Sequence, residues 1–164
     1  MSGAEAARVS IRVEAGLDRT FEAFAFRLGD WWRPHPLFAT TPKAPGTMAL
    51  VDPGPQGRLI ETLAGGQTFE VGRVAIWQPP HRLAFSFRPA TLGPDQATEV
   101  DVSFEPIGDG VRVTLTHRGW ARVPQGHVAR HGFSELLLMT RLSEWWTRQL
   151  ARYKGLSLFD SQGS

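Results

Sequence analysis

Two neighbouring segments alternate strictly between apolar and polar side chains, and this alternation constrains the fold more than any other feature. Valine and phenylalanine occupy every second position of residues 99–105, with acids and serine between them. After a Gly-Asp-Gly turn at 108–110, valine and leucine alternate with polar residues over 111–117. A period of two is that of a β-strand, so the pair predicts an antiparallel hairpin with one wet and one dry face. Another element must cover the dry face.

A helix that can cover this face is predicted near the end of the sequence. About twenty residues up to Tyr153 contain no proline and are rich in strong helix formers. At 100° per residue, Glu144 and several arginines fall on one side, and the opposite side is apolar. The apolar side comprises Leu138, Met139, Leu142, Trp146, Leu150 and Tyr153. A helix of this length spans about 30 Å, enough to lie across a sheet.

The remaining patterns place this hairpin and helix in an α+β fold. Residues 8–14 alternate as a strand, and residues 17–28 have helical spacing that Gly29 is expected to end. A short aromatic segment at 30–33 then stops at Pro34. Further strands are predicted at 48–51, 58–63, 69–77 and 83–87. The order predicts a curved antiparallel sheet of about seven strands wrapped round a long C-terminal helix, with two short helices after the first strand.

Length and composition favour one globular domain. The 164 residues, 41% of them hydrophobic, are enough for a single core, which we expect over residues 8–154. We expect residues 1–7 to be frayed and 155–164 to form a flexible tail. The chain has no cysteine, so disulfides and thiolate sites are excluded. With no apolar run of about 20 residues and no export signal at its start, we expect neither membrane insertion nor export, but a cytoplasmic protein.

Charge and motif scans exclude several function classes. The net charge is only +2 and the basic residues are scattered among acids, so we expect no nucleic-acid partner. The sequence contains no phosphate-binding loop, dinucleotide fingerprint or nucleophile elbow, and we therefore expect no cofactor. His127 and His131 are four residues apart, but no acid completes a zinc pattern, so no metal site is expected.

Several local strings resemble a known superfamily in their order and spacing. They are W-W-x-P at 31–34, P-P-x-R-L at 79–83, V-T-L-T-H-x-G-W at 113–120 and H-G-F at 131–133. Together they resemble the SRPBCC (START-like, helix-grip) superfamily, and within it the domain related to the C-terminal part of the activator of the heat-shock chaperone ATPase. The resemblance implies the helix-grip fold over nearly the whole chain. Such domains include small-ligand carriers, regulators and some cyclases.

Three titratable residues are candidates for a functional role. His117 continues the inward series of its strand, so it can donate to a ligand, act as a general base, or simply be a bonded histidine. Glu135 falls on the apolar side of the predicted helix, where it can anchor a ligand or cap the helix start. His131, just before that helix, can converge with them or be a loop residue. No catalytic residue is assigned with certainty.

The surplus of large aromatic residues favours a ligand-lined cleft between helix and sheet. Each such ring buries about 150–250 Å², and each can belong either to the core or to a pocket wall. The candidate lining residues, together with His117 and Glu135, are Trp31, Phe38, Trp77, Phe85, Phe87, Trp120, Met139, Leu142 and Trp146. This lining requires a gap that helix and sheet leave open between them.

Three functions are consistent with these observations. The leading hypothesis is non-catalytic binding of a small hydrophobic molecule in the cleft. The second is regulation of a chaperone ATPase through protein contacts, which predicts an exposed apolar patch at Trp31–Trp32 or at 156–159. The third is an acid–base enzyme, a cyclase or hydrolase, that uses His117 with Glu135 or His131. The chain is expected to be a monomer or homodimer.

Overall fold

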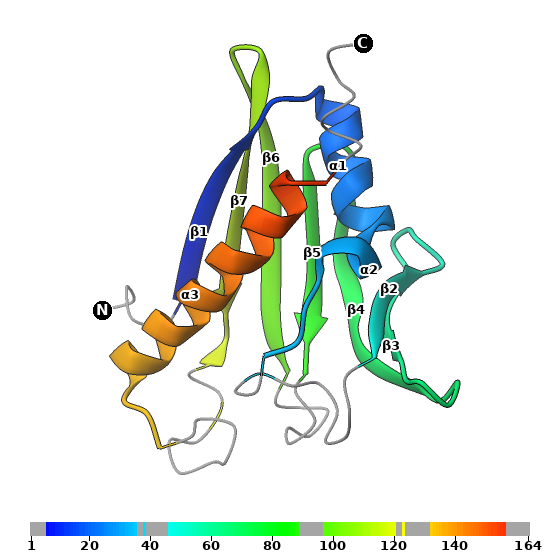
Figure 1. Ribbon diagram of the computed structural model, residues 1–164, viewed down its shortest axis with the longest axis vertical. Coiled ribbons are helices and arrows are strands. Elements are labelled where there is room, and N and C mark those ends of the chain that lie inside the picture. The colour runs from blue at the N-terminus through cyan, green and yellow to red at the C-terminus, as the bar shows by residue number, and fades with distance from the viewer. Residues whose placement is uncertain are drawn as a thin grey trace.

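Seven antiparallel strands form one continuous curved sheet. The computed structural model describes residues 6–35, 38, 46–88, 97–120, 123 and 132–156. Along the sheet the strand order is β1-β7-β6-β5-β4-β3-β2 (Figure 1). The strands are β1 (Ala6–Val13), β2 (Thr47–Val51), β3 (Arg58–Thr62), β4 (Thr68–Gln78), β5 (Arg82–Phe87), β6 (Thr98–Ile107) and β7 (Gly110–Arg118). The predicted α+β helix-grip architecture is confirmed.

Three helices accompany the sheet: α1 (Leu17–Phe26), α2 (Leu28–Trp31) and α3 (Glu135–Lys154). The prediction that one helix continues to residue 28 and ends at Gly29 is wrong. Arg27 leaves the helical conformation, with φ −124° and ψ 30°, and Gly29 lies inside α2. The break redirects the chain so that both Leu28 and Trp31 become buried. Within the described ranges, no helix combines the length and apolar character needed to cross a bilayer.

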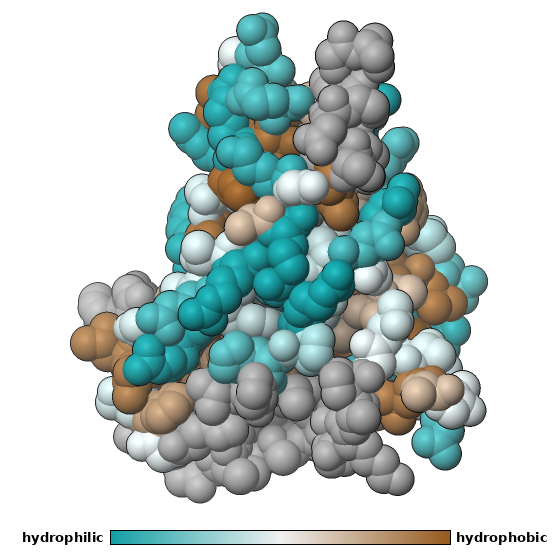
Figure 2. Space-filling model, viewed as in Figure 1, coloured by the Kyte–Doolittle hydropathy of each residue, from teal (hydrophilic) through white to brown (hydrophobic). Residues whose placement is uncertain are grey.

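Helix α3 runs across one face of the sheet (Figure 1). It begins at Ser134, whose Oγ accepts a hydrogen bond from the backbone N of Leu137 at 3.2 Å. Figure 2 shows a hydrophilic band along its outward side. All six residues of the predicted apolar side are buried, and two neighbours are buried with them: Leu138, Met139, Leu142, Trp145, Trp146, Gln149, Leu150 and Tyr153.

Polar contacts also join α3 to the backbone around α2. The Trp145 Nε1 donates to the carbonyl oxygen of Arg33 at 3.1 Å. The Gln149 Oε1 accepts from the Arg33 backbone N at 2.6 Å and from the Arg152 guanidinium at 2.9 Å. Arg152 Nε in turn donates to the carbonyl oxygen of Trp31 at 3.2 Å. Buried backbone groups need such partners, so these contacts hold the segment after α2 against the helix.

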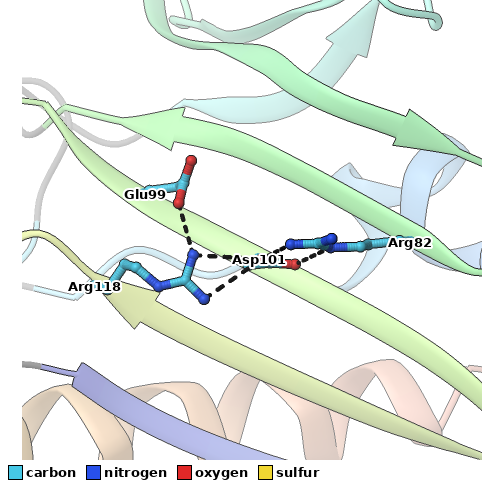
Figure 3. Close-up of polar contacts among 4 residues, drawn as sticks. All are labelled: Arg82, Glu99, Asp101 and Arg118. Atoms are coloured by element: carbon cyan, nitrogen blue, oxygen red, sulfur yellow. Dashed lines mark hydrogen bonds and ion pairs between the residues drawn. The ribbon is translucent and has the colours of Figure 1, made fainter.

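Charged residues on the opposite face of the sheet form the pairs expected from the hairpin pattern. Asp101 on β6 accepts two hydrogen bonds from Arg82, at 2.7 and 3.1 Å, and Arg118 reaches the same carboxylate at 3.3 Å. Figure 3 shows the two guanidinium groups approaching Asp101 from two sides, with Glu99 bonded to Arg118. The hydrogen bonds from Arg82 are the main reason that the pKa of Asp101 lies below its usual value.

Candidate functional site

Seven aromatic rings pack together between α3 and the sheet, and we call them the aromatic cluster. Phe38 stacks on Trp145 with ring centroids 5.3 Å apart and planes inclined by 24°. Trp145 and Trp146 are 4.9 Å apart, and Trp32 lies 5.3 Å from Trp146. The members are Trp32, Phe38, Phe87, His117, Trp120, Trp145 and Trp146. The cluster therefore brings together predicted lining residues from β5, β7, α3 and two connecting segments.

Strand register explains why the sheet contributes to one end of this cluster. Phe87 on β5 lies opposite Thr98 on β6, and Val100 lies opposite His117 on β7. Residues directly opposite share a face of the sheet, as do residues two apart on one strand. All four side chains therefore point to the face that α3 covers. The sequence prediction that His117 points to the dry face is confirmed, because its side chain is completely buried.

His117 uses both ring nitrogens within the protein. Trp146 Nε1, which can only donate, lies 3.1 Å from His117 Nδ1, so Nδ1 must be an acceptor. The proton is then on Nε2, which donates to Thr98 Oγ1 at 2.7 Å. The Thr98 hydroxyl donates in turn to the carbonyl oxygen of Phe87 at 2.9 Å. The chain of hydrogen bonds runs Trp146 to His117 to Thr98 to backbone, and it fixes a neutral imidazole in one tautomer.

Burial keeps this imidazole neutral. It lowers the pKa of His117 from 6.5 to about 3, since the charged form would lose its hydration. At neutral pH the ring is therefore uncharged, and its basic lone pair on Nδ1 already accepts the indole N–H of Trp146. Such a group positions its neighbours and is poorly suited to take a proton from a substrate.

The other two titratable candidates do not join His117. Glu135 is half-buried as the first residue of α3, about 15 Å along the helix axis from Trp145. Among the residues that the structure describes, no hydrogen bond links Glu135 to His117. The Ser134 hydroxyl, rather than Glu135, caps the helix start. His131 lies outside the described residues.

The side chains predicted to line a cleft are packed against one another. The most exposed of the buried set, Met139, has only 5% of its surface accessible. These side chains are almost completely inaccessible to solvent, and Met139 also borders a surface hollow of about 500 Å³. The set comprises Trp31, Phe38, Phe85, Phe87, His117, Trp120, Met139, Leu142 and Trp146. The predicted lining residues thus have low solvent exposure, and the gap between helix and sheet stays a prediction.

Two of the predicted lining residues pack in other parts of the fold. Trp31 packs with Phe24 at 4.8 Å and with Tyr153 at 5.6 Å, in the neighbouring part of the core. Trp77 is half-buried beside α1, where its ring contacts Phe21 at 5.5 Å. The cleft prediction therefore combined residues from three places in the fold.

Sequence reasoning missed Trp32, Thr98 and Trp145. A signal existed for Thr98, because counting back by twos from Val100 places it on the dry face. Trp145 is offset by 100° from Trp146 on the helix, so its burial depends on Trp32 and Phe38 packing against that flank. No pattern within the helix predicts this contact.

The exposed patch that the regulator hypothesis places at Trp31–Trp32 is not there. Both indoles are buried, with 0% and 7% of their surface accessible. Leu156 is half-buried and packs against the core, and residues 157–159 lie outside the described part of the chain. The large apolar residues that are exposed within the described ranges are Phe26, Leu136 and Leu137.

Comparisons with known proteins give a consistent assignment. A family profile described as "Activator of Hsp90 ATPase homolog 1-like protein" matches residues 15–152. A search of curated proteins found no match. Among solved structures, "An anthrahydroquino-Gama-pyrone synthase Txn09 complexed with SUM" is 32% identical, with 93% of this chain and 97% of that chain covered and a TM-score of 0.56.

Two more distant structures show the same fold. Protein CV1439 from Chromobacterium violaceum is 16% identical, with 93% of this chain and 96% of that chain covered and a TM-score of 0.61. PFC0360w, described as an HSP90 activator from Plasmodium falciparum, is also 16% identical, with 88% and 89% covered and a TM-score of 0.57. The family profile spans most of the chain, and the chain therefore belongs to the family of Activator of Hsp90 ATPase homolog 1-like proteins, with the helix-grip fold of the SRPBCC superfamily.

Proposed function

We propose that the protein binds a small planar aromatic molecule at the aromatic cluster and leaves it chemically unchanged. The observation that carries this proposal is the stack of Phe38 on Trp145, at 5.3 Å and 24°. A flat fused-ring ligand can stack on Trp145 in the place that the phenyl ring of Phe38 now occupies. Stacked rings contribute about 0.5–1.5 kcal/mol beyond their buried area, so a larger flat molecule would compete well with one phenyl ring.

For the ligand to enter the cluster, one of its rings must move. We expect this ring to be one that lies in a connecting segment, outside the helices and strands. Five members of the cluster lie in a helix or strand or directly after one. Trp32 follows α2, and the others lie in β5, β7 and α3: Phe87, His117, Trp145 and Trp146. Phe38 and Trp120 belong to connecting segments, with ring centroids 6.1 Å apart. Backbone hydrogen bonds along a strand or helix restrain its side chains more than a connection does.

The chemical class of the ligand is supported by the 32% identical relative. That protein is an anthrahydroquino-γ-pyrone synthase. An anthrahydroquinone is planar, aromatic and hydroxylated, which suits a cluster of indole and phenyl rings. The neutral His117, bonded to Thr98, holds the indole of Trp146 in position without adding charge beside an apolar ligand.

Titration with a hydroxyanthraquinone, followed by calorimetry, tests the proposal. We expect saturable binding by the wild-type protein and at least tenfold weaker binding by Trp145→Leu. Phe38→Ala removes the ring that occupies the proposed position and should bind as tightly as the wild type or more tightly. The matched control is Trp77→Leu, which removes an indole outside the cluster and should leave the affinity unchanged.

Failure of both the wild type and Phe38→Ala to bind would overturn the proposal. Equal loss of affinity in Trp77→Leu and Trp145→Leu would also count against it, because the effect would then be general. If the protein binds no anthraquinone but raises the ATPase rate of an Hsp90 chaperone, regulation through protein contacts replaces it.

Ring closure on the bound molecule is the second candidate function, and the same 32% identity favours it. The described part of the cluster offers no free acid or base, since His117 is neutral with both nitrogens bonded. Catalysis there would rest on holding the substrate in a reactive conformation. Incubation with an open-chain hydroxyaryl precursor, analysed by chromatography and absorbance, distinguishes the two functions. A new product peak that depends on the protein establishes the enzyme, and unchanged precursor supports binding alone.

A further inference from the structure

A surface hollow separate from the aromatic cluster lies between α1 and the turn that joins β4 to β5. Its volume is about 310 Å³, at the lower end of the range for small-molecule sites. Phe21, Phe26 and Trp77 form its aromatic walls, and residues 79–80, both proline, complete the apolar surface. The hollow is therefore large enough for a small organic group and is mostly lined by rings.

The aromatic walls include side chains that remain open to solvent. Phe26 is 50% exposed, although it is a large apolar residue and the other phenylalanines of α1 are buried. Its ring lies 6.2 Å from that of Trp77, which is itself half-buried. Phe21 also contacts Trp77, with ring centroids 5.5 Å apart and planes nearly perpendicular at 74°. Trp77 is thus held in place by two phenyl rings while part of its surface stays accessible.

Two carboxylates on α1 complete the lining of the hollow. Asp18 and Glu22 are four residues apart, so they lie on the same side of the helix. The described lining contains no lysine or arginine. In the described part of the chain neither carboxylate forms an ion pair, and two like charges at this spacing repel each other by a few tenths of a kcal/mol. The hollow therefore combines aromatic faces with two carboxylates that form no ion pair within the described residues.

We propose that this hollow binds an organic ammonium ion, a positively charged nitrogen that carries small apolar substituents. Tryptophan offers the strongest aromatic face for a cation, and the carboxylates of Asp18 and Glu22 supply the opposite charge. The alkyl groups of such an ion also suit Phe26 and the two prolines. A bare metal ion would leave these apolar walls unused, and a neutral molecule would leave the carboxylates unused.

A matched pair of probes separates charge from shape. Choline and 3,3-dimethylbutan-1-ol have the same outline, but a quaternary nitrogen in the first is replaced by carbon in the second. We expect choline to shift the NMR signal of the Trp77 indole N–H in a saturable way, and the alcohol to shift it at least tenfold less at equal concentration. The Trp77→Phe variant assigns the signal by its loss.

Paired variants locate the charge that matters. The double variant Asp18→Asn/Glu22→Gln changes two exposed side chains and should weaken choline binding about tenfold. The control Glu105→Gln/Glu144→Gln makes the same change in net charge at exposed positions elsewhere and should keep wild-type binding. Equal shifts by choline and the alcohol would overturn the proposal. So would equal affinities in the two double variants, or no saturable shift in the wild type.

Discussion

Acidification should destabilise this protein well above the pH at which carboxylates titrate, because of His117. The imidazole has a pKa of about 3 in the folded protein against 6.5 when unfolded. Below about pH 6.5 the unfolded chain binds a proton that the folded chain does not, so the free energy of unfolding falls as the pH falls. The loss is complete only near the folded pKa. From about pH 7.5 to about pH 5 it amounts to about 2 kcal/mol for this one group.

Urea unfolding followed by circular dichroism at a series of pH values measures this loss. His117→Gln is the informative variant, because a glutamine amide can still accept from Trp146 and donate to Thr98 but does not titrate in this range. It should be less stable than the wild type at about pH 7.5 and should lose about 2 kcal/mol less than the wild type on going to about pH 5. His81→Gln changes an exposed histidine and should keep the wild-type pH dependence.

An NMR measurement on the wild-type protein tests the same reasoning without a substitution. The two ring nitrogens of His117 have distinct shifts in the neutral tautomer with the proton on Nε2. This tautomer should persist in the folded protein at about pH 5. A ring that becomes protonated near pH 6.5 while the protein stays folded would refute the argument, as would identical pH slopes for wild type and His117→Gln.

Three further predictions concern stability. Gly72→Ala places a Cβ 1.7 Å from a backbone oxygen of β5 and should cost about 3 kcal/mol in urea unfolding, whereas Gly65→Ala, with nothing within 4 Å, should be close to neutral. The pKa of Asp101 is lowered, mainly by its hydrogen bonds from Arg82, so this pairing stabilises the fold above about pH 4. The stabilisation is lost as the pH falls through the folded pKa. Asp101→Asn should therefore show a smaller fall in the free energy of unfolding than the wild type on acidification below about pH 4. Tyr153→Phe deletes a buried 2.6 Å hydrogen bond to a carbonyl of α1 and should lower thermal stability by about 1 kcal/mol, and an unchanged melting temperature would contradict this.

Local periodicity predicted most of the fold because each element obeys its own repeat. The alternation over 99–117 gives the β6–β7 hairpin, in which Val102 and Leu115 lie opposite each other. The apolar side of α3 is equally local. The break at Arg27 was missed, since both helices that flank it have apolar positions at helical spacing. Tertiary packing of Leu28 and Trp31 decides where the first helix ends.

The candidate site was predicted less well, because it depends on contacts between distant segments. The strand repeat correctly placed His117 on the covered face, but its partners Thr98 and Trp146 come from β6 and α3. Whether aromatic residues line an open cleft or fill it depends on the fit between helix and sheet. Residue type alone therefore did not distinguish a pocket wall from a core position such as Phe87.

Chain order has a consequence for how this protein is made. All seven strands precede α3, and β1 pairs with β7 across about 100 residues of sequence. On the ribosome, the sheet can therefore be complete while its apolar surface still faces water. At about 5–20 residues per second, the 20 residues of α3 take about 1–4 s to synthesise. During that interval the exposed apolar face of the sheet can aggregate. The nascent protein avoids this if a chaperone covers the face, or if the long-range pairing of β1 with β7 is so slow that the sheet closes only after α3 has been made.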